Sequence, residues 1–255
     1  GLIIFDGLCD EDIQVKLSNI FGKCILHPTS EMNVGMKAGL INILFKPEDG
    51  WLVEVDNELR GQWLPWHSDL IYVDKINHGG LLRPIQLPSR LGETGFNDKI
   101  AAYDLLPDDL KEKIENLHVT YNYDVDMSHQ RFGQIHDVKN TRPNKAAADI
   151  IARQHEFPTV THPMVFTQAQ TGRKVLNISP WFATGIAELP GKDGDELLEE
   201  VVGYSTDPGN SYFHKWKMGQ MVLWDNWRLL HCAAGCPPDE TRWLQRTTID
   251  GDYGL

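Results

Sequence analysis

Three side chains in two short segments could together bind a metal ion. The first segment, Trp66-His67-Ser68-Asp69, carries an imidazole and a carboxylate two residues apart. In an extended strand, residues i and i+2 point to the same face, so both side chains can reach one ion. The second segment, Leu229-Leu230-His231, supplies another imidazole. Two imidazoles and one carboxylate bind one face of an octahedral Fe(II), so we expect His67, Asp69 and His231 to form a metal site.

Two arginines follow His231 in the segment Thr241-Arg-Trp-Leu-Gln-Arg246. If this segment is a strand, Arg242 and Arg246 point to one face with Leu244 between them. A guanidinium binds a carboxylate through two parallel hydrogen bonds, as a dicarboxylate such as 2-oxoglutarate requires at the end that does not chelate a metal. The other interpretation is that both arginines pair with surface acids, because the chain has 36 Asp and Glu residues.

Two alternatives come from other classes of protein. His231, Cys232 and Cys236 could bind zinc, although the segment lacks a second cysteine pair, and bound zinc with thiolate ligands would identify such a site. The chain could also be a non-catalytic jelly-roll protein that binds a small molecule. A binding protein has no need of the complete ligand set together with Arg246, which argues against the second alternative.

The order and spacing of several motifs resemble the TauD/TfdA family of Fe(II)- and 2-oxoglutarate-dependent oxygenases, named after taurine dioxygenase and 2,4-D dioxygenase. The resemblance extends over nearly the whole chain. Its motifs are Trp66–Asp69, Leu91–Phe96, Ala101–Pro107, Thr161–Val165, Thr171–Ile178, Val222–Asn226 with His231, and Arg246–Gly251. It implies a fold that is mainly β with flanking helices, built on a double-stranded β-helix (jelly-roll) core with iron at one mouth.

The resemblance also implies a role for each matching residue. Arg246 would bind the distal carboxylate of 2-oxoglutarate, and Thr94 would donate a hydroxyl hydrogen bond to the same molecule. Arg242 would lie near the iron-side carboxylate. Trp224 would pack beside the iron, its alternative interpretation being an ordinary core aromatic. The iron ligands would be His67, Asp69 and His231.

The implied reaction uses O2 to decarboxylate 2-oxoglutarate to succinate and CO2 and to hydroxylate a small organic substrate. Desaturation or ring closure is an alternative outcome of the same chemistry. Taurine-specific members have a Tyr near the position of Ser30 and an Asn near that of Trp63, whereas His27 is kept. These three residues are the candidate substrate-binding residues. Together with Trp66 they predict an anionic, partly apolar or aromatic substrate rather than taurine, unless Trp63 and Trp66 belong to the core.

Short strands must bring these segments together. Many short β segments between Gly and Pro residues predict a sandwich or barrel with helices outside it. The predicted strands are 2–5 (buried), 40–45, 69–72, 80–85, 118–123, 164–167, 175–178, 212–216, 221–224 and 243–249, and the predicted helices are 10–21, 101–117 divided at Pro107, 145–155 and 196–204. We expect one domain over residues 1–255, with the polar stretch 124–161 as a lid or insertion.

Composition limits the partners. A net charge of −12 argues against nucleic acid and anionic membranes, and no apolar run is long enough for a membrane span. Four cysteines are too few for a disulfide framework, so we expect a reducing, cytoplasmic compartment. The expected partner is a small molecule, with homo-oligomerisation left open. Family members usually have a segment ahead of the strand at Leu2, so we expect the chain to be part of a longer protein.

Overall fold

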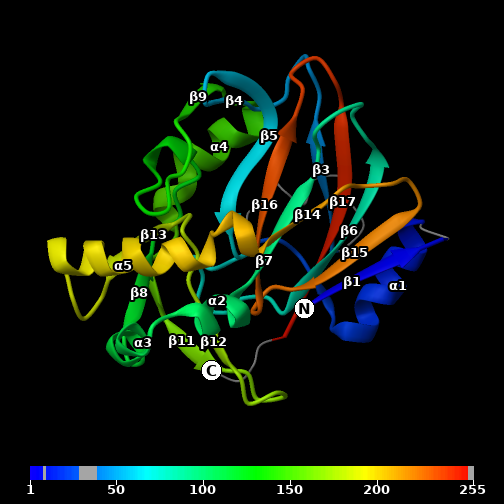
Figure 1. The fold of residues 1–255 in the computed structure, drawn as a ribbon. Coiled ribbons are helices and arrows are strands. Elements are labelled where there is room, and N and C mark those ends of the chain that lie inside the picture. Colours follow the sequence, from blue (N-terminus) through cyan, green and yellow to red (C-terminus); the bar gives the residue numbers. More distant parts are fainter. Residues whose placement is uncertain (8–9, 29–38, 252–255) are drawn as a thin grey trace.

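Two antiparallel sheets form the centre of the computed structural model, which describes residues 1–7, 10–28 and 39–251 (Figure 1). The first sheet contains, in spatial order, β1 (Leu2–Asp6), β15 (Gln220–Asp225), β6 (Gly79–Gln86), β17 (Arg242–Ile249) and β2 (Cys24–Ile25), with β3 (Leu40–Phe45) also paired to β17. The second sheet contains β14 (Ser211–His214), β7 (Thr94–Asp98), β16 (Leu229–Cys236), β5 (Glu58–His67), β4 (Leu52–Val55) and β9 (Val138–Arg142).

The two sheets pack face to face around an apolar interior. Leu82, Trp224 and Leu244 come from the first sheet and contact Phe96 and Leu229 of the second in one buried cluster. Alternate residues of each strand point inward, as in any β-sandwich. In β17, Arg242, Leu244 and Arg246 therefore share the inner face, as their spacing predicts.

Helix α1 (Glu11–Phe21) covers the outer face of the first sheet, at the right of Figure 1. It begins after Asp10, whose carboxylate accepts a hydrogen bond from the Ile13 backbone N–H. Its buried face is polar as well as apolar. The Gln14 amide donates to the Leu81 and Gln245 carbonyls, so α1 is fixed in register on the sheet.

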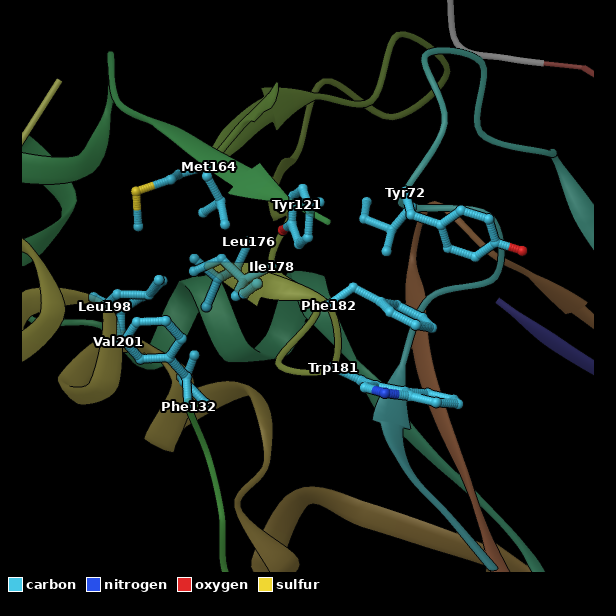
Figure 2. Packing of buried hydrophobic residues seen from close by; sticks show 14 of the residues in the cluster. Tyr72, Tyr121, Phe132, Met164, Leu176, Ile178, Trp181, Phe182, Leu198 and Val201 are labelled. Atoms are coloured by element: carbon cyan, nitrogen blue, oxygen red, sulfur yellow. The ribbon is translucent and has the colours of Figure 1, made fainter. Parts of the chain in front are cut away.

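A larger apolar cluster lies beside the sandwich and includes the remaining helices and sheets. These elements are α2 (Lys99–Leu105), α3 (Asp108–Ile114), α5 (Lys192–Ser205), the sheet of β10 (Val160–Pro163), β8 (His118–Tyr121) and β13 (Ala183–Ile186), and the pair β11 (Val165–Thr167) and β12 (Lys174–Leu176). Figure 2 shows Leu198 and Val201 of α5 near Leu176 and Ile178, with the rings of Trp181 and Phe182 lying parallel farther along the cluster.

The stretch 124–161 contains η2 (Met127–His129), β9, α4 (Lys145–Arg153) and η3 (Gln154–Glu156). Strand β9 pairs with β4 and so extends the second sheet at its edge. Arg142, the last residue of β9, donates hydrogen bonds to the Pro47 and Gly50 carbonyls. The predicted insertion is therefore joined to the sandwich by both backbone and side-chain hydrogen bonds.

Two of the predicted strands need correction. The strand at residues 2–5 exists, but it is an edge strand with Ile3 45% and Ile4 40% exposed, so it is not buried. Residues 69–72 form a turn rather than a strand, with Leu70 at φ 55°. The predicted division of helix 101–117 at Pro107 is confirmed by α2 and α3. Strands β2, β4, β5, β7, β9, β10, β13 and β16 were not predicted.

Candidate metal centre and cavity

The two histidines of the site are direct cross-strand neighbours. Strand β5 ends at His67, which pairs with His231 near the start of β16. The ring centroids lie 4.1 Å apart. The Nδ1 atom of His67 lies 2.8 Å from the Pro65 carbonyl oxygen, so it carries the proton and leaves Nε2 as the free ligand atom.

Asp69 reaches the histidines through a turn, and the premise that it continues the strand of His67 is wrong. Asn226, in the turn between β15 and β16, fixes this conformation. Its Oδ1 accepts a 2.8 Å hydrogen bond from the Asp69 N–H, and its Nδ2 donates a 2.9 Å bond to the Asp69 carbonyl. In a paired strand, the N–H and the carbonyl of Asp69 would bond a neighbouring strand instead. The predicted cluster of His67, Asp69 and His231 is nevertheless present.

The three side chains form a compact set of ligand atoms. The Nε2 atoms of His67 and His231 lie 3.9 and 3.7 Å from Oδ1 of Asp69. All three residues are buried, and their ligand atoms lie within 4.8 Å of one another. Within residues 1–7, 10–28 and 39–251, this is the one cluster of His, Cys, Asp and Glu with such geometry.

The electrostatics suit a divalent cation. Burial lowers the pKa of His67, and burial together with the neighbouring His67 lowers the pKa of His231 further, so both imidazoles are neutral. Burial alone would raise the pKa of Asp69. The Arg246 guanidinium outweighs burial and holds the pKa well below its usual range, so the carboxylate is ionised.

Arg246 lies directly beside Asp69. Its Nη1 donates hydrogen bonds of 2.6 and 2.7 Å to the two carboxylate oxygens. Its Nε is buried and has no hydrogen-bond partner among the residues that the structure describes. Arg246 also lines the cavity described below, so a further anion there could bind it.

Arg242 occupies a deeper position on the same face of β17 and is 1% exposed. Its donors reach neutral acceptors, namely the Gly92 carbonyl and Oε1 of Gln62. Burial lowers its pKa to about 10. Thr94, on β7, is also buried, and its Oγ1 accepts a 3.0 Å hydrogen bond from Trp216 Nε1.

Several polar atoms near the metal ligands are buried without a hydrogen-bond partner in the described part of the chain. Besides Arg246 Nε, they include Trp224 Nε1 and His231 Nδ1. The Trp224 ring lies 5.1 Å from the His231 ring, so it packs beside the candidate ligands as expected. Unpaired buried donors are costly, and a polar molecule between the sheets would satisfy them. The residues present therefore fit a metal ion together with an anionic co-substrate.

A cavity of about 410 Å³ opens beside two of the three ligands, His67 and Asp69. At its polar end lie Asp69, Arg246 and His27. Its walls are largely aromatic and apolar and include Trp51, Trp63, Leu64, Tyr72, Tyr123, Val125, Met127, Ile150, Trp181 and Phe182. The cavity thus combines one polar end, which holds the Arg246–Asp69 ion pair, with a large apolar remainder.

The structure describes two of the three candidate substrate-binding residues. His27 and Trp63 both line the cavity, whereas Ser30 lies outside the described residues. Trp66 points elsewhere and packs with Leu230 and Cys232 in a separate buried cluster, so its interpretation as core is the better one.

The cysteines do not form the alternative zinc site. Cys232 packs with Trp66, whereas Cys236 lies in a different buried cluster with Phe45 and Leu52. Burial raises the pKa of Cys232 to about 12 and that of Cys236 to about 11, which disfavours thiolates.

Sequence reasoning missed the aromatic wall and the supports of the metal ligands. Trp181 lies edge-on to His67, with ring centroids 5.3 Å apart, and stacks on Phe182 at 4.3 Å. Asn226 belonged to a recognised motif, yet only the fold shows that it holds Asp69. Lys99 is buried with its Nζ 3.2 Å from Oγ of Ser68, between the two ligands His67 and Asp69. No feature of the sequence indicated this contact, because a lysine at a helix start is usually exposed.

Comparison with known proteins identifies the family. The family model described as "Taurine catabolism dioxygenase TauD, TfdA family" matches residues 1–248. The (S)-phenoxypropionate/alpha-ketoglutarate-dioxygenase of Sphingobium herbicidovorans is 31% identical over 81% of this chain and 70% of its own length. The alpha-ketoglutarate-dependent 2,4-dichlorophenoxyacetate dioxygenase of a Burkholderia species is 30% identical over 98% of this chain and 82% of its own.

Solved structures agree on the fold. A taurine dioxygenase from Burkholderia xenovorans superposes with a TM-score of 0.72 at 22% identity, over 98% of this chain and 77% of its own. AAD-2, crystallised with Mn(II) and N-oxalylglycine, gives a TM-score of 0.71 at 24% identity, over 98% of this chain and 82% of its own. The predicted jelly-roll core is therefore confirmed.

None of the helices that the structure describes has the length and apolarity that a membrane span requires. The expected enzyme class and its requirement for Fe(II), 2-oxoglutarate and O2 are confirmed by the family match. The chain belongs to the TauD/TfdA family of Fe(II)- and 2-oxoglutarate-dependent dioxygenases.

Proposed function

We propose that this dioxygenase hydroxylates a small organic anion with an aromatic or bulky apolar group. The observation that carries the proposal is the cavity, which places Arg246 and His27 beside the metal ligands and aromatic side chains along the rest of its wall. A cavity of about 410 Å³ suits a molecule larger than taurine.

In this proposal His67, Asp69 and His231 bind the iron. Two neutral imidazoles and one ionised carboxylate need no proton loss at neutral pH before they accept a divalent cation. The remaining coordination positions would be available to 2-oxoglutarate and O2. Trp224 would support the His231 ring from the interior side.

We assign the distal carboxylate of 2-oxoglutarate to Arg242, with Thr94 nearby, rather than to Arg246. Arg246 already contacts a metal ligand and borders the cavity, so it lies at the metal end of the site. Arg242 is four residues along the same face, about 13 Å away along the strand. Among the described residues the acceptors of this buried guanidinium are neutral, and a carboxylate is the partner that such a group favours.

Arg246 and His27 would bind the anionic group of the substrate. The aromatic wall, including Tyr72 and Trp181, would hold the apolar part. Two named relatives act, by their names, on phenoxypropionate and 2,4-dichlorophenoxyacetate, which combine a carboxylate with an aromatic ring. An aryloxy carboxylate is therefore the first candidate class, and sulfate esters are the second, because another relative is named a sulfate ester dioxygenase.

The protein's own contribution is positioning. When bound, iron with 2-oxoglutarate and O2 supplies the oxidising chemistry that replaces C–H with C–OH and releases succinate and CO2. Arg246 and His27 orient the substrate so that the carbon near its anionic group faces the metal ligands. The aromatic wall excludes water around the reacting carbon.

We further propose that residues 124–161 act as the lid, because Met127 and Ile150 of this stretch line the cavity.

Cys24, Cys232 and Cys236 are free thiols, which supports a reducing, cytoplasmic location.

The test is a substrate panel measured by O2 consumption and succinate release with Fe(II) present. The panel contains aryloxy carboxylates, their neutral primary amides, alkyl sulfate esters and taurine at equal concentration. We expect an aryloxy carboxylate or a sulfate ester to give the highest kcat/KM and the matched amide to be at least tenfold poorer. Taurine as the best substrate, or an amide equal to its acid, would contradict the proposal.

A further inference from the structure

Lys99, the first residue of α2, is a buried lysine next to the candidate metal ligands. It is 1% exposed, although lysine is rarely buried without an ionic partner. Its Nζ lies 3.2 Å from Ser68 Oγ, 3.3 Å from Asn177 Oδ1 and 3.5 Å from the Asn226 carbonyl. An ammonium has three N–H donors and no acceptor, so these three neutral acceptors match its donors in number.

Each acceptor belongs to a different segment around the metal site. Ser68 stands between two ligands, His67 and Asp69, and its N–H donates to Ser179. Asn226 holds the Asp69 backbone through two hydrogen bonds. Lys99 therefore joins three segments that are distant in sequence but meet behind the carboxylate ligand.

Burial of the Lys99 ammonium lowers the stability of the fold. Asp225 and Asp98 lie near enough to offset part of the burial cost, but neither carboxylate is a hydrogen-bond partner of Nζ. Burying an ammonium with neutral acceptors costs more than the hydrogen bonds return, and an apolar side chain of similar length is usually as stable or more stable. Burial lowers the pKa of Lys99 to about 7, in agreement with this cost. Two of the three acceptors, Ser68 and Asn226, adjoin the carboxylate ligand, so the costly lysine is better explained by that site than by stability.

We propose that Lys99 is a positioning residue that fixes Ser68 and Asn226 so that the Asp69 carboxylate is preorganised for the metal. The inference rests on the proposed ligand set, and it predicts that metal affinity depends on a side chain that does not touch the metal. Groups that support ligands in this way typically change metal affinity by about 10- to 100-fold.

The test is Lys99→Met, which preserves length and removes the charge and all three donors. Calorimetric titration with Mn(II) should give a Kd at least about tenfold higher than the parent protein, while Tm stays equal or rises. The visible spectrum of the Co(II)-substituted variant should change in band position or intensity, because the carboxylate ligand is less ordered. Lys192→Met is the matched control, since Lys192 is exposed and pairs only with Glu196 on α5.

Leu198→Ala is the second control, because it removes a fully buried side chain of the large cluster without touching the network. It should lower Tm and leave Mn(II) affinity unchanged, which separates a positional effect from general destabilisation. Ser68→Ala removes only the acceptor beside Asp69 and should weaken Mn(II) binding by about threefold or more. It also keeps the test valid if Lys99→Met does not fold.

If Lys99 acts through Ser68, the double variant that combines Lys99→Met with Ser68→Ala should bind Mn(II) no more weakly than Lys99→Met alone. Additive losses in the double variant, or unchanged Mn(II) affinity in both single variants, would overturn the inference. Failure of the parent protein to bind Mn(II) would instead overturn the ligand set itself, so the two failures can be distinguished.

Discussion

The assignment of the two arginines can be tested by replacing each with glutamine. Arg242→Gln and Arg246→Gln both keep hydrogen-bonding side chains of similar bulk and remove one buried positive charge. In the proposal, Arg242 binds the distal carboxylate of 2-oxoglutarate and Arg246 binds Asp69 and the substrate anion. Arg242→Gln should therefore weaken 2-oxoglutarate binding, whereas Arg246→Gln should weaken substrate binding.

The size of the effect follows from burial. Arg242 is 1% exposed, so a carboxylate bound to it would be removed from water along with the guanidinium. Loss of one partner of such a pair costs about 2–5 kcal/mol. Since about 1.4 kcal/mol corresponds to a tenfold change, the Kd for 2-oxoglutarate should rise about 30-fold to several thousandfold in Arg242→Gln.

The assay is anaerobic calorimetric titration of the Mn(II)-loaded protein with 2-oxoglutarate, preceded by measurement of the Mn(II) affinity of each variant. Arg246→Gln should change the 2-oxoglutarate Kd by less than tenfold and raise the substrate KM. Near-parental 2-oxoglutarate binding in Arg242→Gln, combined with its loss in Arg246→Gln, would refute the reasoning. The role that sequence resemblance gave to Arg246 would then be restored.

Three further outcomes are expected. Asp69→Asn should abolish Mn(II) binding in calorimetry, because the neutral amide is a poor ligand and leaves Arg246 without its carboxylate. Trp181→Ala should raise KM for aryloxy carboxylates at least about tenfold more than KM for short alkyl anions, because a large ring is lost from the cavity wall. In chemical denaturation, the parent should gain stability relative to Lys99→Met between pH 7 and 10, since the folded pKa of Lys99 is about 7 against 10.5 for the free side chain. A pH-independent difference would contradict that lowered pKa.

The residue types of the metal site could be predicted from sequence, but the reason for their proximity could not. The sequence suggested that His67 and Asp69 share a strand face. Asp69 instead lies in a turn held by Asn226, a residue 157 positions away. Local periodicity carries no information about such a contact, because it depends on how β15 and β16 pack against the end of β5.

The strands that carry the histidines were missed for a related reason. Strand β5 contains Pro65 and ends in His67, and β16 contains small residues and two cysteines. Neither has the run of β-branched residues that identifies β3 or β17. Strand residues selected for metal binding and close approach depart from strand propensity, so functional strands are harder to recognise than structural ones.

The buried charges explain why a protein of net charge −12 should select anions. Among the described residues, the buried members of the Asp, Glu, Lys and Arg group are Asp69, Lys99, Arg242 and Arg246. Three buried basic side chains thus accompany one buried carboxylate, and a divalent metal ion would increase the excess of positive charge. The doubly charged 2-oxoglutarate and an anionic substrate would offset most of this excess. A neutral substrate would leave buried cations unpaired, so the local charge inside the sandwich, rather than the charge of its surface, sets the expected preference.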